Sequence, residues 1–383
     1  MTGIVDHAGY LDHAATTPMR AEVLEAMLPW LGGGHGNPSG SHRLARLARR
    51  AVDDARDQVA AAVGCEPGEV VFTSGGTEAD DLAVHGTLGR SAGPHIAVCS
   101  AIEHHAVLDP VVASGGRVVS VDERGLVDVE ALAAALDPSV ALVSVILANN
   151  EIGVVQPLEA IAAVVEAQAP QAVLHTDAVQ ALRWLDVGEA AAPAALISLS
   201  GHKIGGPTGV GALVVRAGTI VSPRLTGGGQ ERGRRSGSHN VAGIVGLGVA
   251  ARLCADERKA TVDHVEPLRD RLVDGLLATV ADSWESGARA HKIAGNAHLC
   301  FAGVDAESLL FLLDQEGICA SAASSCSSGA AEPSHVLAAL GIPVERARGS
   351  LRLSLGPDTS DRDVDHALAA VPVAVARIRE TGR

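Results

Sequence analysis

Segments with the character of strands and of helices alternate through the first half of this 383-residue chain. Short apolar runs indicate buried strands, and the stretches between them place apolar residues at helical spacing. Strands joined through helices pair in parallel, so the pattern predicts an α/β fold with a mostly parallel sheet between helices. The expected strands cover residues 70–73, 95–100, 118–121, 140–147 and 173–176.

The composition favours the same fold class. Hydrophobic residues make up 47% of the chain and aromatic residues only 2%, so the core must be built from alanine, valine and leucine. The net charge of −15 argues against general binding of nucleic acid. Neither a signal pattern nor a membrane-length apolar run is found, so we expect a cytoplasmic protein that does not enter a membrane. The arginines between residues 43 and 56 are interpreted as one face of a solvated helix.

The six cysteines match neither a metal site nor a disulfide framework, because no Cys-x-x-Cys pair occurs. Most are expected to be buried small hydrophobic residues in a reducing cytosol. Cys326 differs, since it lies in a segment of small residues, 319–329, that a substrate could approach. We expect no metal ion, because Glu103, His104 and His105 are adjacent and three neighbours in sequence rarely converge on one ion.

A second series of helices and strands follows the first and has no glycine turn of the same kind. An Ala/Val/Gly-rich helix is expected to end near residue 255, and a new run begins near residue 266. We therefore predict a domain boundary near residue 257. The large domain would cover residues 14–257, and a smaller α+β domain would consist of residues 1–13 and 258–383.

A glycine-rich turn between two apolar runs, within residues 198–215, contains Lys203. A lysine in an apolar, tightly turned setting is a candidate for Schiff-base chemistry, because desolvation favours the neutral, nucleophilic amine. Taken alone, a solvated loop lysine is the simpler interpretation. The residues at the other strand ends decide between the two.

Polar residues follow the expected strands, at the end where open parallel sheets bind ligands. Residues 74–79 form a glycine turn before a helix, an arrangement that aims backbone N–H groups at a phosphate. This turn matches neither the dinucleotide motif nor the Walker motif. A helix cap is the alternative role for Asp177, and a turn former is the alternative for Asn37. The candidate ligand contacts at strand ends are His104, Asn150, Asp177, Gln180 and Lys203.

Together these parts suit pyridoxal 5'-phosphate (PLP), which needs a lysine, an acid at its pyridine nitrogen, a phosphate cradle and a group over its ring. With them the chain resembles the NifS/IscS-type cysteine desulfurases of the class V aminotransferase family. The matching motifs span nearly the whole chain in order: Tyr-Leu-Asp-x-Ala-Ala-Thr-Thr-Pro (10–18), Gly-Asn-Pro-Ser (36–39), Thr-Ser-Gly-Gly-Thr-Glu-Ala (73–79), Glu-His-His-Ala-Val (103–107), Ala-Asn-Asn-Glu-Ile-Gly (148–153), His-Thr-Asp-Ala-Val-Gln (175–180), Leu-Ser-Gly-His-Lys (199–203), Gly-Gly-Gly-Gln-Glu (227–231), Arg-Ser-Gly (235–237), Ser-Cys-Ser-Ser-Gly (325–329), Pro-Ser-His-Val-Leu (333–337) and Leu-Arg-Leu-Ser-Leu-Gly (351–356).

The resemblance implies a fold and a role for each matching residue. The fold is the PLP-dependent transferase fold type I, whose large domain has a mostly parallel seven-stranded sheet between helices, beside a smaller α+β domain. Lys203 would hold the cofactor as a Schiff base and move protons, His104 would stack on the ring, and Cys326 would take the sulfur of L-cysteine as a persulfide. Asp177 would pair with the pyridinium nitrogen, and Gln180 with the ring hydroxyl.

Two further groups of residues are implied in the same way. The cofactor phosphate would be held by Gly76, Thr77, Ser200, His202 and, from the other subunit of a homodimer, Ser238. The substrate carboxylate would be held by Asn37, Asn150 and Arg352, with Asn150 also contacting the cofactor.

Three positions depart from the family pattern, because His13, Ser238 and Ala323 stand where Asn, Thr and Gly are usual. Ser238 keeps the hydroxyl, so phosphate binding should survive. Ala323 restricts the backbone close to Cys326, since glycine is the more permissive residue.

The leading hypothesis is a PLP-dependent cysteine desulfurase that yields L-alanine and passes sulfur to an acceptor protein. Iron–sulfur cluster assembly, tRNA thiolation and DNA phosphorothioation are all open destinations for the sulfur, and no direct contact with nucleic acid is expected. The enzymatic alternative is a PLP-dependent aminotransferase or lyase that does not use Cys326. The non-enzymatic alternative is a scaffold subunit that keeps the fold, against which Lys203, Asp177 and Cys326 argue.

Overall fold

The main structural element is a seven-stranded sheet, seen in a computed structural model that describes residues 9–90, 93–322 and 334–381. Its strands are β1 (Val70–Thr73), β2 (Ile96–Ser100), β3 (Arg117–Val119), β4 (Val140–Ser144), β5 (Val173–Asp177), β6 (Leu196–Ser200) and β7 (Gly211–Val215). They follow the order β1-β7-β6-β5-β4-β2-β3. The strands from β3 to β6 pair in parallel, whereas β7 is antiparallel to both β6 and β1. The predicted α/β fold with a mostly parallel seven-stranded sheet is confirmed.

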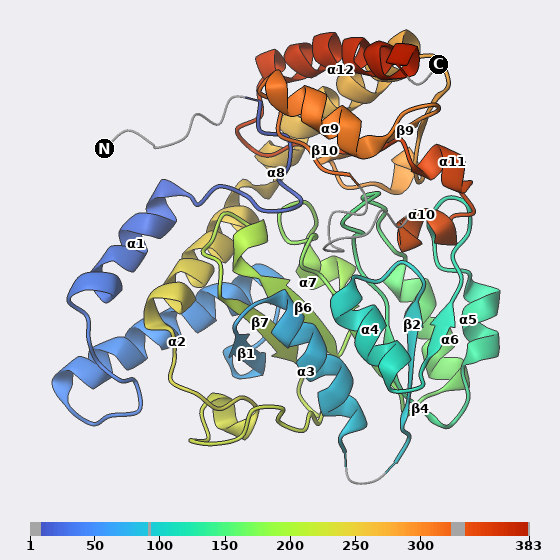
Figure 1. Cartoon of the computed structure of the whole chain (residues 1–383). Coiled ribbons are helices and arrows are strands. Elements are labelled where there is room, and N and C mark those ends of the chain that lie inside the picture. Colours follow the sequence, from blue (N-terminus) through green and yellow to red (C-terminus); the bar gives the residue numbers. More distant parts are fainter. Residues whose placement is uncertain (1–8, 91–92, 323–333, 382–383) are drawn as a thin grey trace.

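Twelve α-helices surround this sheet and a second, smaller one in the described part of the chain (Figure 1). They are α1 (Ala21–Gly32), α2 (Arg43–Val63), α3 (Gly76–Leu88), α4 (His105–Ala113), α5 (Val129–Ala135), α6 (Leu158–Gln168), α7 (Val187–Ala190), α8 (Val241–Thr279), α9 (Ala306–Gln315), α10 (His335–Ala339), α11 (Val344–Ala347) and α12 (Asp361–Thr381). None of the described helices is long and apolar enough to cross a bilayer.

Side chains of the large sheet alternate between two faces, and each face has its own hydrophobic cluster. Val71, Leu142 and Leu213 pack with residues of α3 and α4 on one face. Phe72 and Val143 pack with residues of α2, α5, α6 and α8 on the other face. Because both faces are covered, the strands are continuous apolar runs rather than alternating apolar and polar ones.

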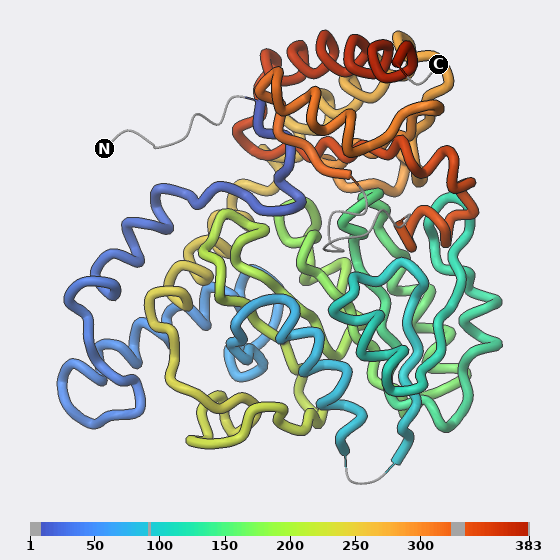
Figure 2. Tube along the Cα trace, in the orientation of Figure 1, coloured from blue at the N-terminus to red at the C-terminus, as the bar shows by residue number. Residues whose placement is uncertain are grey.

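The smaller sheet is antiparallel and consists of β8 (Ser283–Glu285), β9 (Asn296–Phe301) and β10 (Ser350–Ser354), with β9 in the middle. Its cluster includes residues of α9, α12 and the C-terminal half of α8. The N-terminal segment joins it, since Tyr10 bridges to Cys319, Asp12 bridges to Ser354, and Leu11 is fully buried in the cluster. Figure 2 shows this blue segment passing beside the orange and red part of the chain. The exact division into two domains remains a prediction.

Helix α8 corrects one expectation, because it runs for 39 residues through residue 257 instead of ending near residue 255. The stretch 255–264 contains neither glycine nor proline, so nothing in it breaks a helix. Pairs at i,i+4 support the exposed side of this stretch: Arg252 lies 3.2 Å from Asp256, and Lys259 lies 2.6 Å from Asp263. One helix therefore contributes to both hydrophobic clusters.

Gly211 in β7 offers a test of how tightly the sheet meets the glycine turn after β1. A Cβ at this position would lie 2.5 Å from the carbonyl oxygen of Leu199 and 2.7 Å from the carbonyl carbon of Gly75. Both neighbours are main-chain atoms that cannot rotate away, so Gly211→Ala is expected to lower the free energy of unfolding by roughly 1–3 kcal/mol. Urea denaturation measures the effect.

Gly32→Ala is the matched control, because a Cβ at Gly32 meets nothing within 4 Å. Its effect should stay within about 0.5 kcal/mol. Equal stabilities for Gly211→Ala and Gly32→Ala would show that the turn is looser than described.

Candidate active site

A cavity of about 450 Å³ opens at the carboxyl ends of β4, β5 and β6. Ten of the residues predicted for the site line it: Gly76, Thr77, His104, Asn150, Asp177, Gln180, Ser200, His202, Lys203 and Arg352. Asn37 and Ser238 are not among its lining residues. Cys326 and Ala323 lie outside the described residues. The structure therefore brings together most of the residues that the sequence had singled out.

Lys203 reaches the cavity from the 3₁₀ turn Gly201–Lys203, directly after β6. The turn is tight, because a Cβ at Gly201 would lie 2.7 Å from the carbonyl oxygen of Pro207. The Nζ of Lys203 donates to the carbonyl oxygens of Ala14 and Ala15, at 2.6 and 2.8 Å. The N-terminal segment thus forms the wall of the cavity against which the lysine lies.

Asp177 is the last residue of β5 and is only 4% exposed. Burial raises its pKa, while a 2.8 Å hydrogen bond from the Val179 N–H, the charge of Lys203 and, when it is protonated, the charge of His104 act in the opposite direction. A cation brought against this carboxylate would be held strongly, because little water screens the pair. Asp177 is therefore suited to bind a protonated ring nitrogen.

His104 caps helix α4, and its Nδ1 accepts a 3.1 Å hydrogen bond from the Ala106 N–H. Burial lowers the pKa of His104, and Lys203 lowers it further against the attraction of Asp177. The ring is therefore neutral near pH 7, with its proton on Nε2. A neutral imidazole over the cavity can stack on a flat ligand and still donate one hydrogen bond.

The start of α3 forms a cradle for an anion. A Cβ at Gly76 would lie 2.8 Å from Cγ2 of Val179, so only glycine lets the helix begin this close to the turn after β5. Backbone N–H groups at a helix start bind phosphate without a side-chain charge. Ser200 and His202 face the same space, and burial, followed by the charge of Lys203, lowers the pKa of His202 to about 4. His202 is therefore a neutral hydrogen-bonding group.

Arg352 brings a positive charge to the cavity from β10 of the smaller sheet. Its side chain is 3% exposed, donates to Asp12 Oδ1 at 2.8 Å and donates to the carbonyl oxygen of Asn150 at 3.1 Å. Its Nε has no hydrogen-bond partner among the described residues. A guanidinium in such a place is suited to a carboxylate ligand.

Adjacent asparagines after β4 have different surroundings. Asn150 lines the cavity, whereas Asn149 is fully buried and accepts hydrogen bonds from the Glu151 and Ile152 N–H groups at 2.9 Å. Asn149 also donates to the carbonyl oxygen of Ile102 at 2.8 Å. It holds the loop in shape and leaves the cavity to its neighbour.

Asp80 and Asp12 line the cavity and were missed by the sequence reasoning. Asp80 follows Gly76 by four residues in α3, so a helical spacing from the cradle glycine could have pointed to it. Asp12 lies in the N-terminal motif, but nothing in the sequence indicates its pairing with Arg352. Both contacts depend on tertiary packing.

Asn37 lies before α2, and its Oδ1 accepts a 3.0 Å hydrogen bond from the Ser39 N–H. This is the local contact expected of a turn former. Ser238 lies in the loop 227–240, which precedes α8. No lining residue of the cavity comes from either segment among the described residues.

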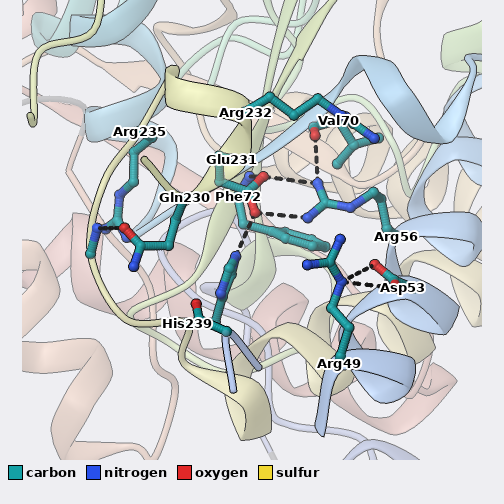
Figure 3. Close-up of polar contacts among 12 residues, drawn as sticks. Arg49, Asp53, Arg56, Val70, Phe72, Gln230, Glu231, Arg232, Arg235 and His239 are labelled. Atoms are coloured by element: carbon teal, nitrogen blue, oxygen red, sulfur yellow. Dashed lines mark hydrogen bonds and ion pairs between the residues drawn. The ribbon is translucent and has the colours of Figure 1, made fainter. Parts of the chain in front are cut away.

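The loop 227–240 is fastened to the large sheet by a buried ion pair (Figure 3). Glu231 accepts hydrogen bonds from Arg56 at 2.7 and 2.8 Å, from the Phe72 N–H at 2.9 Å and from His239 at 2.7 Å. The side chain of Arg56 is 10% exposed. The expectation that all arginines of α2 face solvent is therefore wrong for Arg56, although Arg49 and Asp53 do form an exposed pair.

The ion pair compensates a strained backbone. Glu231 and Arg232 have φ angles of 49° and 57°, which residues with a side chain rarely adopt. Burial alone would raise the pKa of Glu231, but the hydrogen bonds from His239 and Arg56 hold it at about 2. The loop is tied a second time by Arg235, which lies 2.7 Å from Glu78 at the start of α3.

Glu231→Gln tests this fastening, because the variant leaves Arg56 buried without its anion. The expected loss is about 3–5 kcal/mol in the free energy of unfolding near pH 7. The wild-type carboxyl has a lowered pKa in the folded state, so its contribution is complete above about pH 5 and declines as the pH falls toward 2. The difference in the free energy of unfolding between wild type and Glu231→Gln, measured by urea denaturation, should therefore become smaller as the pH falls from about 5 toward 2.

Asp53→Asn is the control, since the Arg49–Asp53 pair is exposed and such pairs contribute about 0.5 kcal/mol or less. A Glu231→Gln loss as small as that of Asp53→Asn would contradict the buried ion pair.

Comparison with known proteins adds independent findings. The model of the family described as aminotransferase class-V matches residues 9–367. The chain is 45% identical over 384 residues to an IscS-like cysteine desulfurase of Mycobacterium tuberculosis (strain H37Rv), covering 97% of each chain. It is 43% identical over 379 residues to the cysteine desulfurase IscS of Methanosarcina thermophila, covering 97% of this chain and 93% of that protein.

The solved structures agree. That of a NifS-like protein superimposes with a TM-score of 0.89 at 31% identity, covering 96% of this chain and 99% of that chain. These matches confirm the family inferred from the motifs, its fold type I and its dependence on PLP. The chain therefore belongs to the aminotransferase class-V family, among the cysteine desulfurases.

Proposed function

We propose that the protein removes sulfur from L-cysteine, releases L-alanine and carries the sulfur as a persulfide on Cys326 to an acceptor protein. The observation that carries this proposal is the meeting of Lys203, Asp177 and His104 in one buried cavity. PLP, when bound, supplies an electron-accepting ring for bonds next to the substrate amine.

The residues present fit this cofactor. A cavity of about 450 Å³ lies in the usual range of small-molecule sites. Lys203 would hold the cofactor covalently, Asp177 would face its ring nitrogen, and His104 would cover one face of the ring. Gln180, whose Nε2 donates to the carbonyl oxygen of Ala14 at 2.7 Å, would meet the ring hydroxyl.

The phosphate would lie at the start of α3. Its partners there would be Gly76, Thr77, Ser200 and His202, which supply N–H and hydroxyl donors without a full charge. We propose that a homodimer completes the cradle with Ser238 of the partner subunit. The fastened loop 227–240 supports this, because a loop held by Glu231 and Arg235 presents Ser238 in a defined place.

Substrate carboxylate binding falls to Arg352 and Asn150, and we include Asn37 on the resemblance alone. Arg352 supplies a buried positive charge with one N–H free of partners among the described residues. The amine of Lys203 moves the proton at the substrate carbon, while the neutral ring of His104 keeps its Nε2 proton for hydrogen bonding.

Cys326 is the proposed sulfur carrier, although it lies outside the described residues. The segment before it passes the cavity, because Ser321 lines it and exchanges hydrogen bonds with the main chain of Arg352 at 2.7 and 3.2 Å. The described cysteines are poor alternatives, since burial raises the pKa of each thiol: Cys65, Cys99, Cys254, Cys300 and Cys319. A thiolate is needed for attack on sulfur.

The remaining parts of the proposal follow from the sequence. Residues 14–257 form the PLP-binding domain, and residues 1–13 and 258–383 form the smaller domain that carries Cys326. The enzyme works in the cytoplasm with a protein acceptor. A PLP-dependent aminotransferase or lyase that leaves Cys326 unused is the alternative that the experiments below separate from it.

Lys203 is tested by borohydride, which should fix the cofactor onto this side chain and remove the near-visible absorbance. Peptide mapping of the reduced protein locates the label. Lys259 and Lys292 serve as internal controls, because the first pairs with Asp263 on an exposed helix and the second is buried against Glu285. A label on either of them would overturn the assignment.

Cys326→Ala is expected to separate cofactor chemistry from sulfur capture. The variant should bind the cofactor and still change its spectrum with L-cysteine, but carry no persulfide by intact mass and release no sulfide under reductant. The control variant Cys319→Ala, which removes an exposed thiol, should still form the persulfide and still release sulfide under reductant. If Cys326→Ala releases sulfide and alanine at the wild-type rate, the desulfurase mechanism is wrong and the protein is a PLP-dependent lyase that does not use Cys326.

A further inference from the structure

A second carboxyl, Asp80, lies beside Asp177 in the wall of the cavity. It is 1% exposed and lies in the second turn of α3. Leu142, Val173 and Leu196 point to the face of the sheet that α3 covers. Side chains alternate along a strand, so those that follow by two residues share this face. Ser144, His175, Asp177 and Ser198 are therefore on the α3 side.

A neutral hydrogen-bond chain surrounds Asp80. His175 Nδ1 lies 2.8 Å from Ser144 Oγ, and its Nε2 lies 3.0 Å from Ser198 Oγ and 3.6 Å from Asp80 Oδ1. Burial lowers the pKa of His175 to about 3, so this ring carries no charge near pH 7. Asp80 Oδ1 has no hydrogen-bond partner among the described residues.

The charged groups that face Asp80 are negative. They are Asp177 from β5 and Glu103 from the turn between β2 and α4, and β6 contributes only the hydroxyl of Ser198. Strands β1, β4 and β7 contain no ionisable residue. Helix α4 carries His105 and Asp109, which pair with each other at 3.0 Å on its exposed side.

Burial first, and then the charge of Asp177, raises the pKa of Asp80 well above its usual range. Burial also raises the pKa of Glu103 to about 8. Carboxylates that share a desolvated site do not all ionise, because their repulsion is barely screened. The anion settles where it is best compensated, which is Asp177 with its hydrogen bond from the Val179 N–H and the attraction of Lys203.

We propose that Asp80 is a positioning residue that holds a proton near pH 7 and thereby confines the negative charge of the site to Asp177. The role toward the cofactor rests on the proposed function, in which Asp177 faces the ring nitrogen. The claim that Asp80 holds a proton does not depend on the proposed function, since it follows from the packing of α3 on β5 and β6. The two claims can therefore fail separately.

Asp80→Asn tests the proposal by pH-dependent unfolding of the full chain in urea, with and without added PLP, between pH 5 and pH 9. A carboxyl that is protonated when folded and ionised when unfolded makes wild type lose stability as the pH rises above about 4. The amide does not titrate. The ratio of the unfolding equilibrium constants, wild type over variant, should therefore rise by up to tenfold per pH unit.

Asp256→Asn is the matched control, because Asp256 is exposed and lies 3.2 Å from Arg252 on a helix surface. The ratio of the unfolding equilibrium constants, wild type over Asp256→Asn, should stay constant between pH 5 and pH 9. A constant ratio for Asp80→Asn as well would overturn the proposal.

The link to Asp177 is tested by repeating the series in an Asp177→Asn background. Without the neighbouring charge, the proton on Asp80 is held less strongly, so the rise of the ratio should end at a lower pH. An unchanged profile would overturn the claim that Asp80 confines the charge to Asp177.

Infrared difference spectra give a second readout that does not depend on unfolding. At pH 7 the spectrum of wild type minus that of Asp80→Asn should contain the carbonyl stretch of one protonated carboxyl, because other protonated carboxyls such as Glu103 contribute equally to both proteins and cancel. If Asp80→Asn fails to fold, Asp80→Ser supplies the comparison. A spectrum in which the variant loses only a carboxylate band would overturn the proposal, whereas failure of PLP to bind would count against the proposed function alone.

Discussion

Parallel pairing of β4, β5 and β6 is the constraint on which the active site depends. The ladder aligns Ser144 with His175 and Asp177 with Ser198, so the three strands end at one edge. The loops that leave this edge carry Asn150 and Lys203, and both residues therefore line the same cavity. A slip of one residue would turn Asp177 to the opposite face and put Thr176 or Ala178, neither of which can carry a charge, in its place. The chemistry thus rests on the same hydrogen bonds as the fold.

Around that edge of the sheet, burial determines which side chains carry a charge. His175 and His202 are kept neutral because desolvation lowers the pKa of each, and the carboxyls of Asp80 and Glu103 are driven toward the protonated form. The strong charges that remain at the cavity belong to groups with compensating partners. Arg352 has Asp12 at 2.8 Å, and Asp177 has a backbone N–H at 2.8 Å. This pattern suits a ligand that places a cation against Asp177 and an anion against Arg352.

Sequence reasoning reaches the fold class, the family and most of the residues that line the cavity, because strand ends and motif spacing are local properties. It fails where tertiary packing decides. The arginines of α2 share one composition, yet only packing separates the buried Arg56 from the exposed Arg49. Asp80 looks like any polar residue of a helix until β5 and β6 cover it. Helix α8 continues past residue 257 because neither glycine nor proline interrupts residues 255–264 and because each of its halves packs into a hydrophobic cluster, and only the first of these conditions is visible in the sequence.

Helix α8 also links the two halves of the molecule mechanically. Its first half packs on α1 and α2, and its second half packs on α12 and the smaller sheet. Pro267 lies inside α8, in the half that packs on the smaller sheet, and its ring removes one backbone hydrogen bond there, so a bend of the helix costs least at this position. Because α8 contributes buried side chains to both hydrophobic clusters, unfolding of either cluster leaves part of the apolar surface of this helix exposed to water, which couples the unfolding of one core to that of the other.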